Sequence, residues 1–254
     1  MIPFIVFVFG LAVGSFLNSV IWRLEKGESF FYGRSYCPHC RHTLSWRDLI
    51  PVLSFVLLRG RCRYCSKPIS LQYPLVELAT GILFVLVFRY LNFDIANVIY
   101  LLTIVSILIT IFVYDLKHFI IPDQLVYPAI AVSGIWYLVS SIQDTRYEIL
   151  DTAYSALGAV FFLAVYLVSR GRWLGFGDVK LALLMGLFLG WPNVLVALFA
   201  AVVLGAVAGL ALIALKEKTM KSEIPFGPFL VAGTFVALFF GKALVNWYLT
   251  LVLV

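Results

Sequence analysis

Residues 175–180 read GFGDVK and lead directly into the apolar run LALLMGLFLG over 181–190. This stretch predicts a membrane-embedded helix that begins near Asp178. The two glycines before it, Gly175 and Gly177, predict a tight backbone turn. An ionisable residue in a membrane helix is costly and marks a functional site, but an aspartate in a first turn can also simply cap its helix. This stretch alone leaves both interpretations of Asp178 open.

The composition of the whole chain excludes an ordinary soluble domain. Of the 254 residues, 63% are hydrophobic and 13% are charged. Apolar stretches of about 18 or more residues predict membrane helices. The net charge of +6 indicates membrane topology rather than nucleic-acid binding. We therefore expect an all-α membrane protein with about eight transmembrane helices, over 2–22, 73–90, 95–114, 124–142, 153–168, 178–190, 194–215 and 229–253.

One long polar segment, residues 23–72, interrupts the apolar runs. It carries nine of the 19 Lys and Arg residues, so the positive-inside rule places it in the cytoplasm and both termini outside. We expect three parts: a first transmembrane helix (1–22), a cytoplasmic zinc-binding loop (23–72) and a seven-helix membrane domain (73–254). The helix predicted at 178–190 is short, because about 13 residues reach only about 20 Å of a ~30 Å hydrocarbon core.

The first helix carries small residues at the spacing that lets two helices approach closely. Gly10, Gly14 and Ser15 form such a small-xxx-small face. Asn18, near the end of the span, predicts a hydrogen bond to a neighbouring helix. The apolar run has no basic region before it and no small-residue cleavage site after it, so we expect a retained helix rather than a removed signal peptide.

The polar segment contains all four cysteines of the chain, as two CxxC pairs separated by 21 residues. This spacing is typical of a tetrahedral zinc site with four thiolate ligands. Disulfides are the alternative, but a reducing cytoplasm disfavours them. His39 and His42 are alternative ligands, although four thiolates already saturate zinc. The pattern predicts a closed, structural Zn²⁺ site formed by Cys37, Cys40, Cys62 and Cys65.

A second aspartate, Asp115, follows the helix predicted at 95–114. An anion is unfavourable at a helix C-terminus, so capping does not explain Asp115. A salt bridge to Lys117 or Lys180 remains an alternative. Asp123 is different, because it follows Pro122 at the start of the next helix, where an aspartate cap is ordinary.

The predicted topology places Asp115 and Asp178 at the same membrane face. Two carboxylates that share a proton are the arrangement of aspartic proteases. One activates water as a general base, and the other protonates or polarises the scissile carbonyl. The helix dipoles predict that Asp178 stays ionised at an N-terminus and that Asp115 holds the proton at a C-terminus.

At this point the chain resembles a known family, the bacterial type IV prepilin peptidases, which are GxGD-type intramembrane aspartic proteases. The resemblance covers nearly the whole chain. It rests on GSFLN over 14–18, the paired CxxC loop, YPLVEL over 73–78, Asp115 ahead of IPD at 121–123, GFGDVK, and PFGPFL over 225–230. One departure is visible at Glu25, where the family commonly has proline.

The resemblance implies that Asp115 and Asp178 are the catalytic pair, and it favours Asp115 over Asp123. It implies a multi-pass protein of the bacterial inner membrane that cuts the basic leader of prepilins or pseudopilins after a glycine, at the cytoplasmic face. These substrates belong to type IV pilus, type II secretion and competence systems. The family then methylates the new N-terminus from S-adenosylmethionine. The sequence has no glycine-rich nucleotide fingerprint of the Rossmann type, so the residues that bind this donor stay unassigned.

Two other classes of protein compete with the enzyme. A polytopic transporter or channel would place polar residues along a path at the membrane midplane, and Lys242 within the last predicted helix fits that idea best. Snorkelling of this lysine, or pairing inside the bundle, is the simpler interpretation. A membrane-anchored zinc-ribbon scaffold would explain the cysteines but not Asp115.

Overall fold

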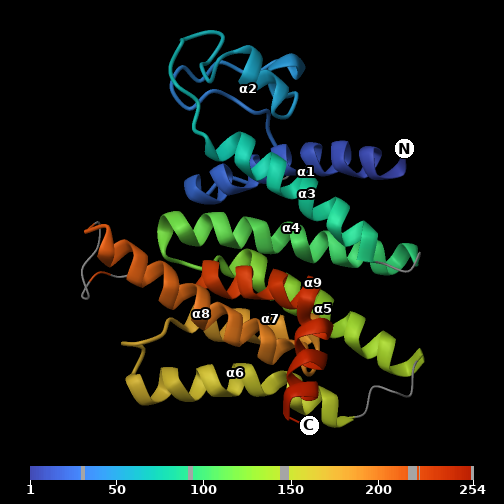
Figure 1. Cartoon of the computed structure of the whole chain (residues 1–254). Coiled ribbons are helices and arrows are strands. Elements are labelled where there is room, and N and C mark those ends of the chain that lie inside the picture. The colour runs from blue at the N-terminus through green and yellow to red at the C-terminus, as the bar shows by residue number, and fades with distance from the viewer. Residues whose placement is uncertain (30–31, 91–93, 144–148, 217–221, 223, 253–254) are drawn as a thin grey trace. The chain divides into compact units, whose positions relative to one another are not determined.

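The computed structural model describes residues 1–29, 32–90, 94–143, 149–216, 222 and 224–252 (Figure 1). These residues are mostly helical and form no β-strand, only two isolated bridges. All eight predicted helices are present, and the polar segment adds two short ones, η1 (Trp46–Leu49) and α2 (Leu53–Leu57). The eight are α1 (Ile2–Lys26), α3 (Gln72–Tyr90), α4 (Ile95–His118), α5 (Asp123–Gln143), α6 (Ile149–Ser169), α7 (Phe176–Leu189), α8 (Asn193–Ala214) and α9 (Gly227–Val252).

Five of these helices are long and apolar enough to cross a membrane within the described residues: α1, α3, α4, α8 and α9. These helices indicate a multi-pass membrane protein, as predicted. The full count of eight spans stays a prediction for α5, α6 and α7. Helix α7 is too short for a simple span, since its 14 residues extend only about 21 Å.

The chain folds into two compact units, residues 1–110 and 111–254. In the first unit α1 packs against α3, and the predicted small-residue face lies at this contact. A Cβ atom at Gly14 would stand 2.6 Å from the Cα of Glu77, so only glycine permits this approach. Asn18 donates a 3.0 Å hydrogen bond to the backbone carbonyl of Tyr73 on α3, as predicted. The division into 1–22, 23–72 and 73–254 stays a prediction.

The second unit is built around α7, which contacts α5, α6, α8 and α9. A helix that is apolar on all sides is expected to be buried on all sides. Leu181, Ala182, Leu184 and Met185 are indeed fully buried. Helix α7 therefore lies inside protein for most of its length, which explains how so short a helix is accommodated. Its first turn, with Asp178, is the part that opens into a cavity.

Two helix boundaries near this cavity differ from the predicted ones. Helix α4 continues to His118, beyond the predicted end at Tyr114, so Asp115 lies inside its last turn rather than after it. Helix α9 begins at Gly227, two residues before the predicted start. The second difference matters for Asp115, because it brings the N-terminus of α9 to its side chain.

Candidate active site

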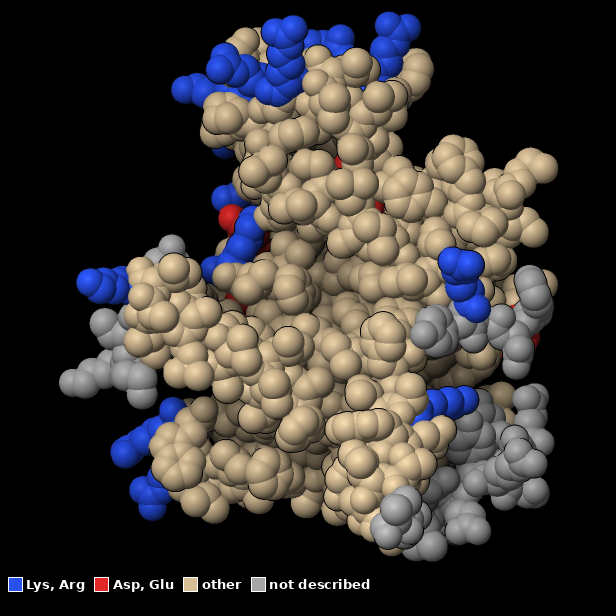
Figure 2. All heavy atoms as spheres, in the orientation of Figure 1, with Lys and Arg blue, Asp and Glu red and all other residues tan. Residues whose placement is uncertain are grey.

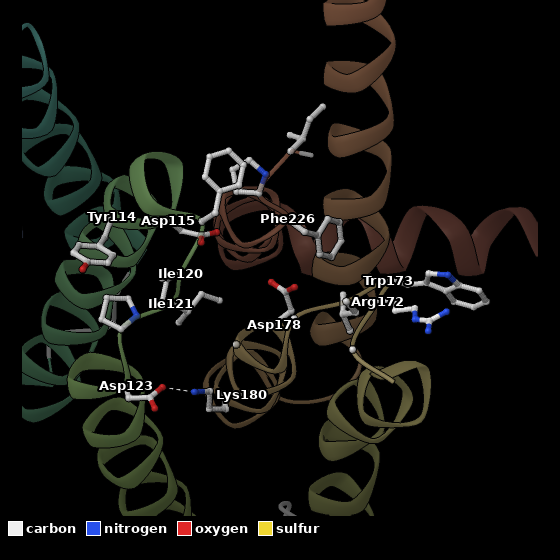
Figure 3. Close-up of a pocket in the computed structure, with 18 residues that line it drawn as sticks. Tyr114, Asp115, Ile120, Ile121, Asp123, Arg172, Trp173, Asp178, Lys180 and Phe226 are labelled. Carbon is white, nitrogen blue, oxygen red and sulfur yellow. Dashed lines mark hydrogen bonds and ion pairs between the residues drawn. The ribbon is translucent and has the colours of Figure 1, made fainter. Parts of the chain in front are cut away.

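The second unit contains a cavity of about 600 Å³ (Figure 3). Its wall is formed by the end of α4, the segment 119–123, the turn 171–175, the first turn of α7 and residues 224–226. Apolar and aromatic side chains make up much of this wall. The carboxylates of Asp115 and Asp178 enter it from two different helices, so the two predicted site residues share one cavity.

Asp115 is held by the beginning of α9. Its side chain is buried, with 4% of the residue exposed, and it accepts a hydrogen bond from the backbone N–H of Gly227. A helix N-terminus carries a partial positive charge, which favours a carboxylate at this position. A Cβ atom at Gly227 would stand 3.1 Å from the Cγ of Asp115 and closer still to its Oδ2. Glycine is therefore required where α9 meets the carboxylate.

This role of Gly227 was not found from the sequence. The PFGPFL stretch resembles the family, but its residues alone do not indicate a contact with Asp115. The signal that could have found it is the glycine between two prolines at a helix start. Such a residue exposes a backbone N–H with no side chain in the way.

Asp178 is the third residue of α7, and Gly175 is the N-cap, without a side-chain cap bond. The Asp178 carboxylate accepts a hydrogen bond from the backbone N–H of Gly175, as the acid of a capping box does. The capping interpretation is thus partly right, yet the same side chain lines the cavity.

The two glycines of this motif do not form the tight turn that was predicted. Gly175 has φ −71° and ψ 148°, an extended conformation open to any residue, so the predicted need for a glycine turn here is wrong. At Gly177 a Cβ atom would stand 3.2 Å from the Cβ of Ile121. Gly177 thus lets the first turn of α7 approach the segment that follows α4.

The two carboxylates interact electrostatically, and their negative charges repel one another. Figure 3 shows them pointing into the same space from α4 and α7. No ion pair of the described residues involves Asp115, so neither Lys117 nor Lys180 is seen to neutralise it. The predicted protonation split relied on opposite helix dipoles. Because Asp115 also faces the N-terminus of α9, dipoles no longer separate the two groups, and the split stays a prediction.

Lys180 points to Asp123 rather than to Asp178. It forms an ion pair with Asp123 at the start of α5 (Figure 3). Its ammonium group also lies 5.1 Å from the ring centroid of Tyr127 and 5.4 Å from that of Phe176. This pair joins the first turns of α5 and α7 at the cavity wall and leaves Asp178 without a cationic partner from Lys180.

The cysteine loop lies in the first unit. All four thiols are free, so the described structure contains none of the alternative disulfides. Their Sγ atoms lie within 4.8 Å of one another, and those of Cys37 and Cys65 are 3.9 Å apart. Tetrahedral zinc–thiolate bonds of about 2.3 Å place sulfur atoms about 3.8 Å apart. The donor set fits a zinc ion, with Cys37, Cys40, Cys62 and Cys65 as its ligands.

The two CxxC turns have matching backbones. The N–H of Cys37 donates to the carbonyl of His42 (3.0 Å), and the N–H of Cys62 donates to that of Lys67 (2.8 Å). His42 stacks on Tyr64 at 3.7 Å between ring centroids, and the thiol cluster includes no histidine. The loop therefore forms two equivalent knuckles that face one another.

Asp48 links η1 to the second knuckle. Its carboxylate accepts hydrogen bonds from the hydroxyl of Ser45 (2.7 Å), the Nε of Arg63 (2.7 Å) and the hydroxyl of Tyr64 (3.1 Å). Burial alone would raise the pKa of Asp48, but the hydrogen bonds from Ser45, Arg63 and Tyr64 outweigh it and lower the pKa to about 2. The group stays ionised and fixes the loop.

Glu77 attaches the loop to α3. This buried carboxylate, in the second turn of α3, accepts a 2.7 Å hydrogen bond from the backbone N–H of Val52. Val52 directly precedes α2 and has φ 60°, a conformation that non-glycine residues rarely adopt. The bond therefore holds the start of α2 beside the end of a membrane helix.

Comparison with known proteins identifies the family of the chain. Residues 8–91 match the bacterial peptidase A24 N-terminal domain, and residues 102–210 match the type IV leader peptidase family. A prepilin leader peptidase/N-methyltransferase of Aeromonas hydrophila is 33% identical over 272 residues, which cover 97% of this chain and 93% of the relative. The chain belongs to the type IV leader peptidase family.

Other relatives of this leader peptidase carry the same name. The one from Legionella pneumophila is 32% identical over 274 residues, covering 96% of this chain and 93% of the relative. The one from Bacillus subtilis strain 168 is 30% identical over 250 residues, covering 98% of both. No solved structure matches the chain. The resemblance read from the sequence is confirmed at the level of the family.

Proposed function

We propose that this leader peptidase hydrolyses a peptide bond of prepilins or pseudopilins with Asp115 and Asp178 as its catalytic pair. One observation carries the proposal: two carboxylates from distant parts of the chain enter the same cavity of about 600 Å³. No ion pair among the described residues explains the burial of Asp115, and capping does not explain why Asp178 also lines the cavity. Two acidic groups that repel one another in a partly buried site are poised to share a proton.

In the reaction, the ionised member of the pair takes a proton from water, and the water oxygen attacks the scissile carbonyl carbon. The protonated member donates its proton to the carbonyl oxygen. The tetrahedral intermediate then collapses: one of its hydroxyls returns a proton to the carboxylate that had donated one, the C–N bond breaks, and the amine leaves with the proton taken from water. The backbone N–H groups of Gly175 and Gly227 orient the two carboxylates throughout.

The substrate follows from the family and fits the cavity wall. The curated relatives are named prepilin leader peptidases. We infer that this chain removes a short basic leader after a glycine, at the cytoplasmic face of the inner membrane. The apolar part of the wall, which includes Ile121 and Phe226, suits a hydrophobic peptide that leaves the bilayer.

The second activity is N-methylation of the new N-terminus, as the names of the relatives state for those proteins. The methyl group would come from S-adenosylmethionine. The described residues contain no strand–glycine turn–helix unit that would cradle a nucleotide. We therefore assign no residue to this donor and derive no step through it.

Zinc is the ion we propose for the four thiolates, in a closed structural site. Its role is to hold the two knuckles together in a segment with few buried apolar residues. Metal analysis of the purified full-length protein tests this, with about one zinc per chain expected from the four-ligand set. Zinc content should fall sharply in Cys62→Ser. A chain that folds and retains activity without any bound zinc would rule the proposal out.

The catalytic assignment is tested by prepilin cleavage in membranes that contain Asp115→Asn, Asp178→Asn or Asp123→Asn, each checked for expression. The first two should abolish cleavage, because asparagine keeps the shape but cannot exchange the proton. Asp123→Asn should cleave, because Asp123 is engaged by Lys180 at the cavity wall. Loss of activity in Asp123→Asn with full activity in Asp115→Asn would show that Asp123 is the true partner.

The arrangement of the carboxylates also disfavours the two rival classes of protein, a transporter and a zinc-ribbon scaffold. A transporter would need polar groups along a path, whereas the described carboxylates Asp115, Asp123 and Asp178 gather at one cavity. A scaffold would not need Asp115 to be buried next to Asp178.

A further inference from the structure

The cysteine loop exposes several large apolar side chains outside any candidate membrane span. Leu53, Val56 and Leu57 of α2 are 51%, 62% and 71% exposed. Their spacing places them on one face of the helix. The ring of Phe55 faces inward, 3.1 Å from where a Cβ atom of Gly60 would stand. Helix α2 thus has a packed side and a separate apolar side.

Trp46 and Leu49 of η1 extend the exposed apolar surface. They are 71% and 39% exposed, and η1 packs beside α2. We call the surface formed by these two residues together with Leu53, Val56 and Leu57 the α2 face. Exposed apolar patches with a polar rim mark interaction sites, so the α2 face needs an occupant.

The charge around the α2 face indicates an anionic occupant. Residues 34–72 contain seven Lys and Arg residues and one acid, Asp48, which is engaged by Arg63. Arg47, Arg59 and Arg61 flank the face in sequence, and all three are exposed. Figure 2 shows Lys and Arg side chains gathered over this part of the first unit. A Zn²⁺ ion with four thiolates would contribute −2 and leave the segment cationic. A basic leader peptide would be repelled.

The position of the α2 face indicates that this occupant is a membrane surface. Glu77 holds Val52, the residue before α2, at the second turn of α3. Helix α3 is a candidate membrane span, and it begins at Gln72, only seven residues after Cys65. Helix α2 is thereby kept at the level where α3 leaves the bilayer. Anionic lipid headgroups are always within its reach, at a high effective concentration.

We propose that the α2 face docks on the anionic surface of the membrane in which the chain itself is embedded. Its apolar side chains lie among the headgroups, and the flanking arginines contact lipid phosphates. This combination of a cationic rim and an apolar face is the chemistry of interfacial helices. Docking would fix the cysteine loop against the bilayer, and it does not depend on the catalytic assignment.

Hydrogen–deuterium exchange of the full-length protein tests this proposal. The protein is placed in nanodiscs of phosphatidylcholine alone or of phosphatidylcholine mixed with phosphatidylglycerol, and peptides spanning 46–61 are followed. We expect exchange to be slower in the anionic discs by about tenfold or more, since each arginine near an anionic surface contributes a factor of about five. High salt should remove much of this difference.

Three variants make the result specific. Leu53→Ser combined with Leu57→Ser should lose the protection. In Arg47→Gln combined with Arg59→Gln, the protection should remain, but it should no longer depend on anionic lipid. Tyr32→Ser, an exposed aromatic residue in the same loop but off the α2 face, is the matched control and should change nothing. Zinc content verifies that each variant keeps the loop folded, and the arginine variants still decide the question if the serine variant does not fold.

Other occupants would give different results. Equal protection in both kinds of disc, lost on serine substitution, would mean that the α2 face packs against another part of the chain. Protection that appears only when prepilin is added would assign the face to the substrate. Fast exchange under every condition would mean that the face is free. Each of these three outcomes overturns the proposal.

Discussion

Replacement of Gly227 by alanine is a direct test of how Asp115 is positioned. The added methyl group would stand 3.1 Å from the Cγ of Asp115, closer to its Oδ2, and 3.3 Å from the Cδ1 of Ile121. Carbon atoms pack at about 3.5–4.0 Å, so the carboxylate has to retreat by roughly 1 Å. A misplacement of about 1 Å can reduce a rate about 100-fold, which corresponds to about 2.7 kcal/mol in the barrier.

The assay is steady-state cleavage of a prepilin by the reconstituted protein, with kcat and KM determined separately. Gly227→Ala should lower kcat and leave KM nearly unchanged, because the methyl group disturbs Asp115, the proposed catalytic carboxylate, more than the cavity wall. Gly134→Ala is the matched control, since no atom lies within 4 Å of a Cβ at that position in α5. The control should keep full activity and gain about 0.5–1 kcal/mol of stability.

One result would refute the reasoning. If Gly227→Ala is folded, as judged by its melting temperature, and cleaves within about threefold of wild type, the displacement of about 1 Å does not affect catalysis. Asp115 would then have no catalytic role in the placement described here. If Gly227→Ala does not fold, the same measurement is made on Gly227→Ala combined with the stabilising Gly134→Ala.

Three further predictions concern the loop, the first helix pair and the cavity wall. The pKa of Asp48 is lowered from 3.8 to about 2, so its stabilising effect is complete at neutral pH and is lost as the pH falls from about 3.8 through about 2. Asp48→Asn should therefore weaken the loop at pH 7 by about 1–3 kcal/mol, seen as faster zinc loss to a chelator; an unchanged rate would contradict this role. Gly14→Val should lower the melting temperature through overpacking of about 1–3 kcal/mol against α3, and an unchanged melting temperature would mean that the helices separate freely. Lys180→Met should change stability by no more than about 1 kcal/mol, because Asp123 is largely exposed, and should leave cleavage nearly intact; a large rise in KM would instead show that Lys180 binds substrate.

The helices themselves were predictable because apolar runs of membrane length are a strong signal. The Gly14 face was also predictable, since small residues at this spacing in a membrane helix commonly mark a close contact between two helices. Likewise, the spacing of the four cysteines specified a cluster that the folded chain forms. In each case the information is local in the sequence or repeats at a fixed interval.

The site was only partly predictable, because its key contacts join distant segments. Asp115 was expected at the unfavourable end of one helix, and nothing in its neighbourhood indicated that Gly227 would bring the favourable end of another. The partner of Lys180 was equally open, since Asp123 becomes its neighbour only when α5 and α7 are packed. Helix α2 was missed because five residues give too little periodicity to detect.

The contact between Asp115 and Gly227 has a consequence for biosynthesis. The segments that form the cavity leave the ribosome in the order α4, α7 and α9, so the backbone donor to Asp115 arrives last. A nascent chain that already contains both aspartates still lacks the group that orients the first of them. With Asp115 in the proposed catalytic pair, hydrolytic competence is delayed until α9 has joined the bundle, and a half-inserted chain should not cleave its neighbours in the bilayer.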